Sequence, residues 1–304
     1  MEFILHTLDH QLERSLKITE LDYLNVYKSN ELIKSYYNFE QIFDNVVENY
    51  YEFEVELLSS SARFIIEGNT DFDWFLFHFS IVVRRLLNVM STARGYLDQS
   101  SSLIKGMLED PELFQDYDDF KHCLYDEHLG YRVMEALRNY SQHSNLPLKS
   151  TSFTTKHSKL SNTSRVTLKP YIKPKNFLND DKFKASVREE LISIGDTVDI
   201  KPLLREYIAC LGKLHNEARK IIDKKSSSVI EHLNVLSDRY FDLFDYEDDL
   251  TFMVLKQSKP NLIEESEYLY TSLDKARKKL RSKNGRIMFI EKLHVSGEVA
   301  GEDI

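Results

Sequence analysis

The sequence holds a guanidinium, a carboxamide and an imidazole within six residues, at Arg138, Asn139 and His143. An imidazole transfers protons near neutral pH, either as a general base or as a general acid. A planar guanidinium binds phosphate oxygens and stabilises negative charge that develops on them. The amide between them can orient either group. These residue types at this spacing predict a site that holds a phosphate and moves a proton beside it.

A helix that ends at His143 is predicted to position these three side chains. Its apolar stripe, at positions i, i+4, i+8 and i+11, consists of Leu129, Val133, Leu137 and Tyr140. Such a stripe must face a core. Asn139 and His143 lie four residues apart on the other side of the helix, and Arg138 lies at the flank of that side. Residues 144–147 end the helix, because Pro147 disfavours helical backbone before it.

Further polar residues on or near this face, Arg132, Glu135 and Gln142, are candidates to contact these three side chains and hold them in position. Taken without the rest of the motif, Arg138 and His143 also fit an ordinary solvated helix end, where a cation suits the helix dipole.

The order Arg-Asn-x-x-x-His near the end of a helix resembles the motif of the HEPN superfamily. Its members are helical-bundle domains found in many prokaryotic toxins and defence proteins. The resemblance covers residues 138–143 and the helical segment upstream. It implies a metal-independent endoribonuclease that needs no cofactor. It also implies a homodimer in which two copies of the motif line one cleft. In this chain Arg138 would hold the scissile phosphate, Asn139 would orient it or the imidazole, and His143 would act on the 2′-hydroxyl or the departing 5′-oxygen.

The charge distribution is compatible with RNA as a partner, although the net charge of −9 argues against a protein that coats nucleic acid. Residues 136–179 contain no Asp or Glu. Beyond Arg138, the cations of this stretch are Lys149, Lys156, Lys159, Arg165, Lys169, Lys173 and Lys175, which we predict to bind RNA. Aromatic residues interleave them, as expected where unstacked bases are contacted. The alternative is a basic hairpin that docks on acidic residues 116–119 or 247–249.

Composition predicts a mainly α fold: a helical bundle with a short β-hairpin insertion and a second helical region. The chain has 304 residues, of which 9 are Gly and 6 are Pro, too few for the frequent turns of a β-sandwich. We expect helices at residues 29–68, 70–108, 111–143, 181–194, 200–223, 227–244 and 261–281. Whether Gly130 divides the third of these is open. Strands are expected at residues 152–158 and 164–172, and a closing strand or helix at 287–295.

These elements suggest four consecutive parts: a HEPN-like bundle at 1–148, a basic β-hairpin or linker at 149–176, a C-terminal helical region at 177–295 and a flexible tail at 296–304. Between 245 and 249 an acidic turn is expected.

Other features exclude several classes of protein. Cys123 and Cys210 stand alone, without the spacing of a zinc site or a disulfide framework, so we expect no metal. No apolar stretch is long enough to span a membrane, and the first residues lack a secretion signal, so a cytoplasmic protein is expected. A cognate antitoxin or sensor is a candidate partner. The main alternative function is a non-catalytic helical module that binds a protein or nucleic acid; a HEPN-like domain that has lost activity is a third.

Overall fold

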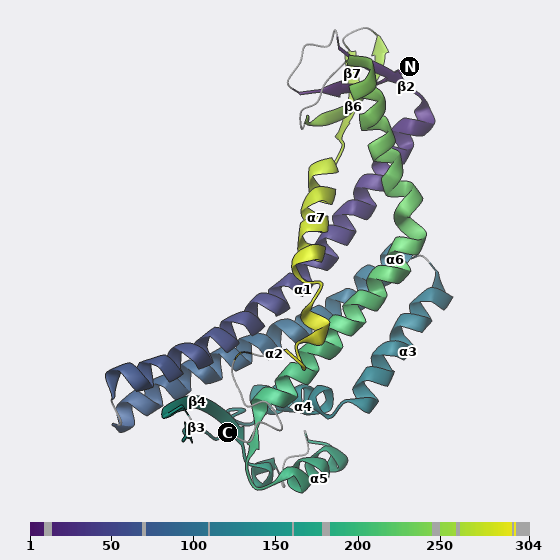
Figure 1. Cartoon of the computed structure of the whole chain (residues 1–304). Coiled ribbons are helices and arrows are strands. Elements are labelled where there is room, and N and C mark those ends of the chain that lie inside the picture. The colour runs from purple at the N-terminus through teal and green to yellow at the C-terminus, as the bar shows by residue number, and fades with distance from the viewer. Residues whose placement is uncertain are drawn as a thin grey trace. The chain divides into compact units, whose positions relative to one another are not determined.

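The structure is a computed structural model that describes residues 1–8, 14–68, 71–108, 110–159, 161–177, 183–244, 250–259, 262–293 and 295 (Figure 1). It is mainly α, with two small antiparallel sheets. The predicted fold class, a helical protein with a β-hairpin insertion and a second helical region, is confirmed. Among the described residues, no helix combines the length and apolarity needed to cross a membrane.

The helices are α1 (Glu20–Glu67), α2 (Phe72–Leu108), α3 (Pro111–Glu127), α4 (Leu129–His143), α5 (Ala185–Ile194), α6 (Ile200–Phe244) and α7 (Thr271–Lys283), with 3₁₀ turns η1 (Pro174–Phe177) and η2 (Ile287–Phe289). The strands are β1 (Glu2–Thr7), β2 (Leu16–Ile18), β3 (Ser150–Ser158), β4 (Thr163–Ile172), β5 (Val198–Asp199), β6 (Phe252–Lys259) and β7 (Leu262–Tyr268).

Local capping explains where the first three helices begin. The Asp71 carboxylate accepts the Trp74 N–H at 2.8 Å, and Asp110 accepts the N–H groups of the first turn of α3 behind Pro111. Both starts were expected. Helix α1 begins at Glu20 and not at residue 29 as expected. Thr19 and Asp22 form a capping box there, in which each side chain accepts the backbone N–H of the other residue.

Helix α6 is continuous, and the predicted break between residues 223 and 227 is wrong. The Ser226 hydroxyl donates to the Ile222 carbonyl at 2.7 Å, so this serine is accommodated inside the helix. Ile222, Ile230 and Leu233 are buried and continue one apolar stripe through the serine-rich stretch. Packing therefore outweighs the weak helix propensity of the serines.

A four-stranded antiparallel sheet with the order β2-β1-β6-β7 was not expected. Residues 1–148 are thus not helical throughout, and the helix predicted at 261–281 is instead strand β7 followed by α7. In this sheet Leu5 of β1 lies opposite Val254 of β6. The pairing of β1 with β6 spans most of the chain length, and a local pattern gives no signal for such a pairing. The β1–β2 and β6–β7 pairs are local in the sequence, and they too differ from the expected helices and loops.

The predicted β-hairpin is confirmed as β3 and β4, which pair from Ser150 opposite Tyr171 to Ser158 opposite Thr163. The short strand β5 pairs with the other edge of β4. Phe153 of β3 stacks on Phe64 of α1, with ring centroids 4.3 Å apart. The hairpin is therefore anchored by an aromatic contact.

The chain divides into two compact units that are interleaved along the sequence. The first comprises residues 1–41, 102–114 and 218–283, and the second comprises 42–101, 115–217 and 284–304. The four consecutive parts expected from the sequence differ from this division, since its boundaries fall inside α1, α2, α3 and α6. A closing strand or helix was expected at residues 287–295. Among the described residues of this range, the regular structure consists of the 3₁₀ turn η2. The predicted tail at 296–304 and acidic turn at 245–249 lie outside the described residues.

Buried polar contacts join α1, α2 and α6 in the second unit. Arg205 of α6 binds both carboxylate oxygens of Glu54 of α1 at 2.9 and 3.2 Å, and the Tyr50 hydroxyl donates to the same carboxylate at 2.8 Å. His215 of α6 stacks on Phe43 of α1, and its Nδ1 lies 3.1 Å from the Tyr96 hydroxyl of α2. These contacts fix the three long helices around one core, against which α4 packs.

Gly130, near the start of α4, packs directly against α6. Its N–H donates to the Glu206 carboxylate at 2.5 Å, and a β-carbon at this position would lie 2.6 Å from Glu206 Oε2 and still closer to the Leu203 carbonyl oxygen. Residue 128 separates α3 from α4, so the helical run does divide beside this glycine. Close approach to α6, rather than a turn, requires glycine here.

We expect Gly130→Ala to lower the free energy of unfolding by about 1–3 kcal/mol, because α4 must move away from α6. The matched control is Gly106→Ala in α2, where a β-carbon meets nothing within 4 Å. It should raise stability by up to about 1 kcal/mol through helix propensity. Urea unfolding of both variants tests this. Equal effects of the two substitutions would contradict the close packing of α4 on α6.

Candidate active site

Helix α4 presents the predicted motif at its C-terminal end. Val133, Leu137 and Tyr140 are buried, as the apolar stripe predicts. The helix ends at His143, where the Ser144 N–H still donates to the Tyr140 carbonyl at 2.8 Å. Asn139 and His143 are exposed and one helical turn apart. The helix therefore separates a buried face from a polar face that carries the motif.

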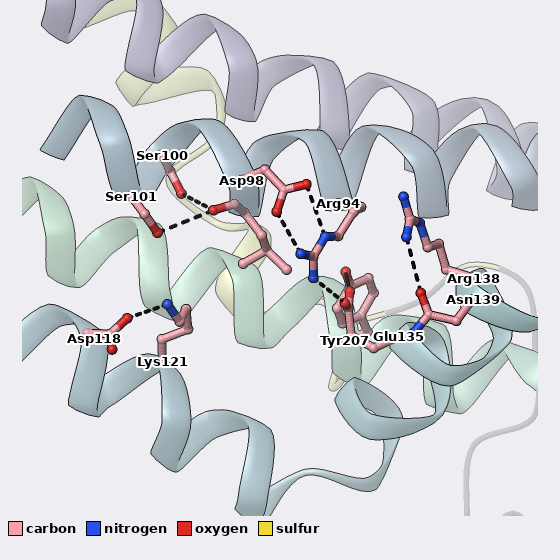
Figure 2. Close-up of polar contacts among 11 residues, drawn as sticks. Arg94, Asp98, Ser100, Ser101, Asp118, Lys121, Glu135, Arg138, Asn139 and Tyr207 are labelled. Carbon is pink, nitrogen blue, oxygen red and sulfur yellow. Dashed lines mark hydrogen bonds and ion pairs between the residues drawn. The ribbon is translucent and has the colours of Figure 1, made fainter. Parts of the chain in front are cut away.

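Arg138 and Asn139 are in direct contact (Figure 2). Arg138 Nη1 donates to Asn139 Oδ1 at 3.1 Å, and the guanidinium is half-buried. Its Nε is buried and lacks a hydrogen-bond partner in the part of the chain that the structure describes. The His143 side chain has no hydrogen bond to either residue among those described, although it lies on the adjacent turn. The structure thus brings together two of the three predicted catalytic residues.

The environment of Arg138 differs from that of other arginines of the second unit. Arg85 binds Glu52, Arg132 binds Glu190 and Arg205 binds Glu54, and each of these arginines is buried or half-buried. Arg138 has no carboxylate partner within the described ranges. A half-buried guanidinium that lacks a counter-ion is suited to bind an anion from solution.

The three residues expected to hold the motif side chains in position, Arg132, Glu135 and Gln142, bind other partners or are exposed. Arg132 donates to the Glu190 carboxylate at 2.5 Å and to backbone carbonyls at the end of α3. Glu135 accepts hydrogen bonds from α2 and α6, while Gln142 is exposed. The hydrogen bonds of Arg132 and Glu135 thus do not go to Arg138 or His143. Any effect of these two on the motif passes through the position of α4.

A polar network that the sequence did not reveal holds α4 one turn before Asn139 (Figure 2). The Tyr207 hydroxyl of α6 donates to Glu135 Oε1 at 2.7 Å, and Arg94 Nη1 of α2 donates to Glu135 Oε2 at 3.1 Å. Arg94 also binds Asp98 at 2.7 Å. Burial, followed by the negative charge of Glu135, raises the pKa of Tyr207 well above that of a free tyrosine, so this hydroxyl stays a donor. The only hint in the sequence was an acid on the motif helix.

The basic residues of the hairpin segment are spread along its length. Lys149 and Lys173 line a cavity of about 180 Å³ with Tyr140 and Asn145, directly after the end of α4. Lys156 and Arg165 are cross-strand partners near the far end of the hairpin, next to Lys159 in the turn. That end is eight residues along β3 from Ser150, roughly 25 Å at 3.3 Å per residue. The structure brings Lys149 and Lys173, but not the residues of the tip, to the motif end of α4.

Lys175 and Lys169, the other two residues predicted to bind RNA, differ in their surroundings. Lys175 pairs with Asp196 at 2.7 Å, and both side chains are exposed. Lys169 is half-buried on β4. Residues 247–249, one of the two acidic segments on which the basic hairpin could dock, lie outside the described residues.

No protein-family model matches this chain, and no curated protein or solved structure matches it either. Within the described part of the chain, no group of three or more His, Cys, Asp or Glu side chains is arranged to hold a metal ion. The geometry of Arg138, Asn139 and His143 at the end of α4 is therefore the basis for proposing a function.

Proposed function

We propose that the protein is a metal-independent endoribonuclease of toxin or antiviral-defence type, acting in the cytoplasm, with its site at Arg138, Asn139 and His143. The observation that carries the proposal is the half-buried residue Arg138, which lacks a carboxylate partner among the described residues and is followed five residues later on α4 by the exposed imidazole of His143. An anionic phosphate supplies the missing counter-ion. Lys149 and Lys173 beside the helix end extend the positive region for the RNA backbone.

The reaction is a transesterification at one phosphodiester. A base removes the proton of the 2′-hydroxyl, the 2′-oxygen attacks phosphorus, and the bond to the 5′-oxygen breaks as that oxygen takes up a proton. Arg138 stabilises the charge on the non-bridging oxygens, and its contact with Asn139 fixes the guanidinium. The products are a 2′,3′-cyclic phosphate and a 5′-hydroxyl, so every atom and proton is accounted for.

Two proton transfers favour two imidazoles, and one chain supplies one His143 in this motif. A twofold homodimer that joins the ends of two α4 helices would supply the second. A cognate antitoxin or sensor protein is the proposed regulatory partner.

Arg138→Ala tests the proposal. We expect cleavage of a mixed RNA substrate in EDTA to fall by about 10²–10³-fold, since a positioned donor to the transition state is lost. The control is Arg84→Ala, an exposed arginine of α2, which should cleave like the wild type. Gel analysis of RNA with both variants measures this. Equal activity of the three proteins would refute the site, and wild-type activity lost on chelation would indicate a metal nuclease.

A second candidate function, a non-catalytic module that binds a partner protein, is favoured by exposed apolar side chains where α1 and α2 approach their connection. Ile66, Phe72 and Phe77 are exposed by 82, 77 and 61%. Exposed apolar patches of this kind mark interaction surfaces. A wild-type protein that binds a partner but cleaves no RNA would favour this function over the nuclease.

A further inference from the structure

A cavity of about 560 Å³ lies between α2, α3 and α4, bounded also by Lys184 before α5. We refer to it as the α2–α4 cavity. Its volume is in the range of small-molecule sites. Leu97 and Tyr131, both buried, give it an apolar floor, and the Tyr125 ring meets Tyr131 edge to face at 5.6 Å. The cavity therefore has the size and the aromatic surface to accept a planar ring.

The charges that line the cavity balance. Three cations, Arg94, Lys121 and Lys184, stand against three carboxylates, Asp98, Asp126 and Glu135. A neutral ligand with both donors and acceptors suits such a lining better than a strongly charged one. This balance separates the α2–α4 cavity from the cationic region at the end of α4.

Most of these charges are already satisfied within the protein. Arg94 binds Asp98 and Glu135, and Lys121 binds Asp118 outside the lining (Figure 2). Two groups remain without an ion-pair partner in the described part of the chain. These are the Asp126 carboxylate and the Lys184 ammonium, which lies 5.1 Å from the Tyr125 ring centroid. One acceptor and one donor are thus left for a ligand.

We propose that the α2–α4 cavity binds a guanine base. The Watson–Crick edge of guanine carries two adjacent N–H donors next to a carbonyl oxygen, which matches the Asp126 carboxylate and the Lys184 ammonium. Adenine, cytosine and uracil lack two adjacent donors on that edge. The heteroaromatic ring of the base would lie against the half-buried ring of Tyr125.

The face of α4 that lines the cavity also carries Asn139 of the motif. Tyr131, Glu135 and Asn139 follow one another at intervals of four residues, so they form one stripe on the helix. Tyr131 and Glu135 line the cavity, and Asn139 contacts Arg138. If the cavity binds a guanine base of RNA, the proposal rests on the proposed ribonuclease function, and the substrate class is single-stranded RNA that contains guanosine. If the cavity binds free guanosine, the proposal does not depend on that function.

Isothermal titration of the four free nucleosides into the full-length protein tests the cavity without any cleavage. We expect guanosine to bind at least about tenfold more tightly than adenosine, cytidine or uridine. Ser101→Trp, on the α2 wall of the cavity, should weaken guanosine binding by at least about tenfold. Ser91→Trp, at an exposed site of the same helix, is the matched control and should bind like the wild type.

Asp126→Asn replaces a carboxylate acceptor by an amide and leaves the backbone carbonyl that binds Arg132 in place. It should reduce the preference for guanosine even if the tryptophan variant fails to fold. Absence of nucleoside binding, or guanosine binding that neither Ser101→Trp nor Asp126→Asn changes, would overturn the assignment.

The source of the base is decided by mapping cleavage sites on RNA. A cut at a fixed distance from guanines, lost in Asp126→Asn, identifies the base as part of the substrate. Guanosine binding with no preference in the cuts, or with no cleavage at all, identifies a free nucleoside. If guanosine binds and no RNA is cleaved, the proposed ribonuclease function fails while the cavity is still a guanosine site.

Discussion

His143→Ala is expected to reduce RNA cleavage by about 10²–10⁴-fold while the protein stays folded and continues to bind RNA. The side chain is exposed and makes no hydrogen bond within the described residues, so its removal costs little stability. The proposed phosphate contact of Arg138 does not depend on it. Loss of rate without loss of binding is the signature of a group that transfers a proton and does not hold the substrate.

Single-turnover cleavage and an RNA-binding titration, both in EDTA, measure the two effects for His143→Ala. His232→Ala, a histidine of the first compact unit, is the control and should retain the wild-type rate. A His143→Ala protein that binds RNA less tightly by the same factor as it loses activity would contradict a role in proton transfer.

Glu54→Ala is expected to lower the free energy of unfolding by about 3–5 kcal/mol. It leaves Arg205 as a buried charge without its carboxylate, and it also removes the acceptor of the Tyr50 hydroxyl. Only 5% of the Arg205 side chain and 10% of the Glu54 side chain are exposed, so water cannot replace the lost partner. This pair joins α1 to α6, and its loss should loosen the second unit as a whole.

Glu31→Ala is the matched control for Glu54→Ala, because Glu31 pairs with Lys34 on the surface of the same helix and is 74% exposed. Such a pair contributes less than about 1 kcal/mol. Chemical denaturation of both variants tests the difference. Similar losses for the two would mean that burial of the Arg205–Glu54 pair has little effect on stability.

The sequence predicted those parts of the fold that local chemistry determines. The Asp71 and Asp110 carboxylates accept N–H groups at the starts of α2 and α3, and Pro147 follows the end of α4 at His143 by four residues. The capping box of Thr19 and Asp22 is an equally local signal for the start of α1. Strand β1 pairs with the three-residue strand β2 on one edge and with β6, near the other end of the chain, on the other edge. Non-local strand pairing leaves little trace in a short sequence window.

The candidate site shows the same division. The polar face of Asn139 and His143 follows from the apolar stripe of α4, which a helical wheel reveals. The partners of Glu135, Arg94 and Tyr207, come from other helices and could not be assigned from spacing along α4. The lack of a carboxylate beside Arg138 in the described structure is likewise a property of the folded chain.

The most direct test of the proposed ribonuclease is the chemistry of the RNA ends that the wild-type protein produces in EDTA. Transesterification by His143 and Arg138 predicts 5′-hydroxyl ends, which a polynucleotide kinase labels without prior phosphatase treatment, and 2′,3′-cyclic phosphates on the other fragment. Fragments with 5′-phosphate ends, or intact RNA after prolonged incubation with the folded protein, would contradict the proposed function.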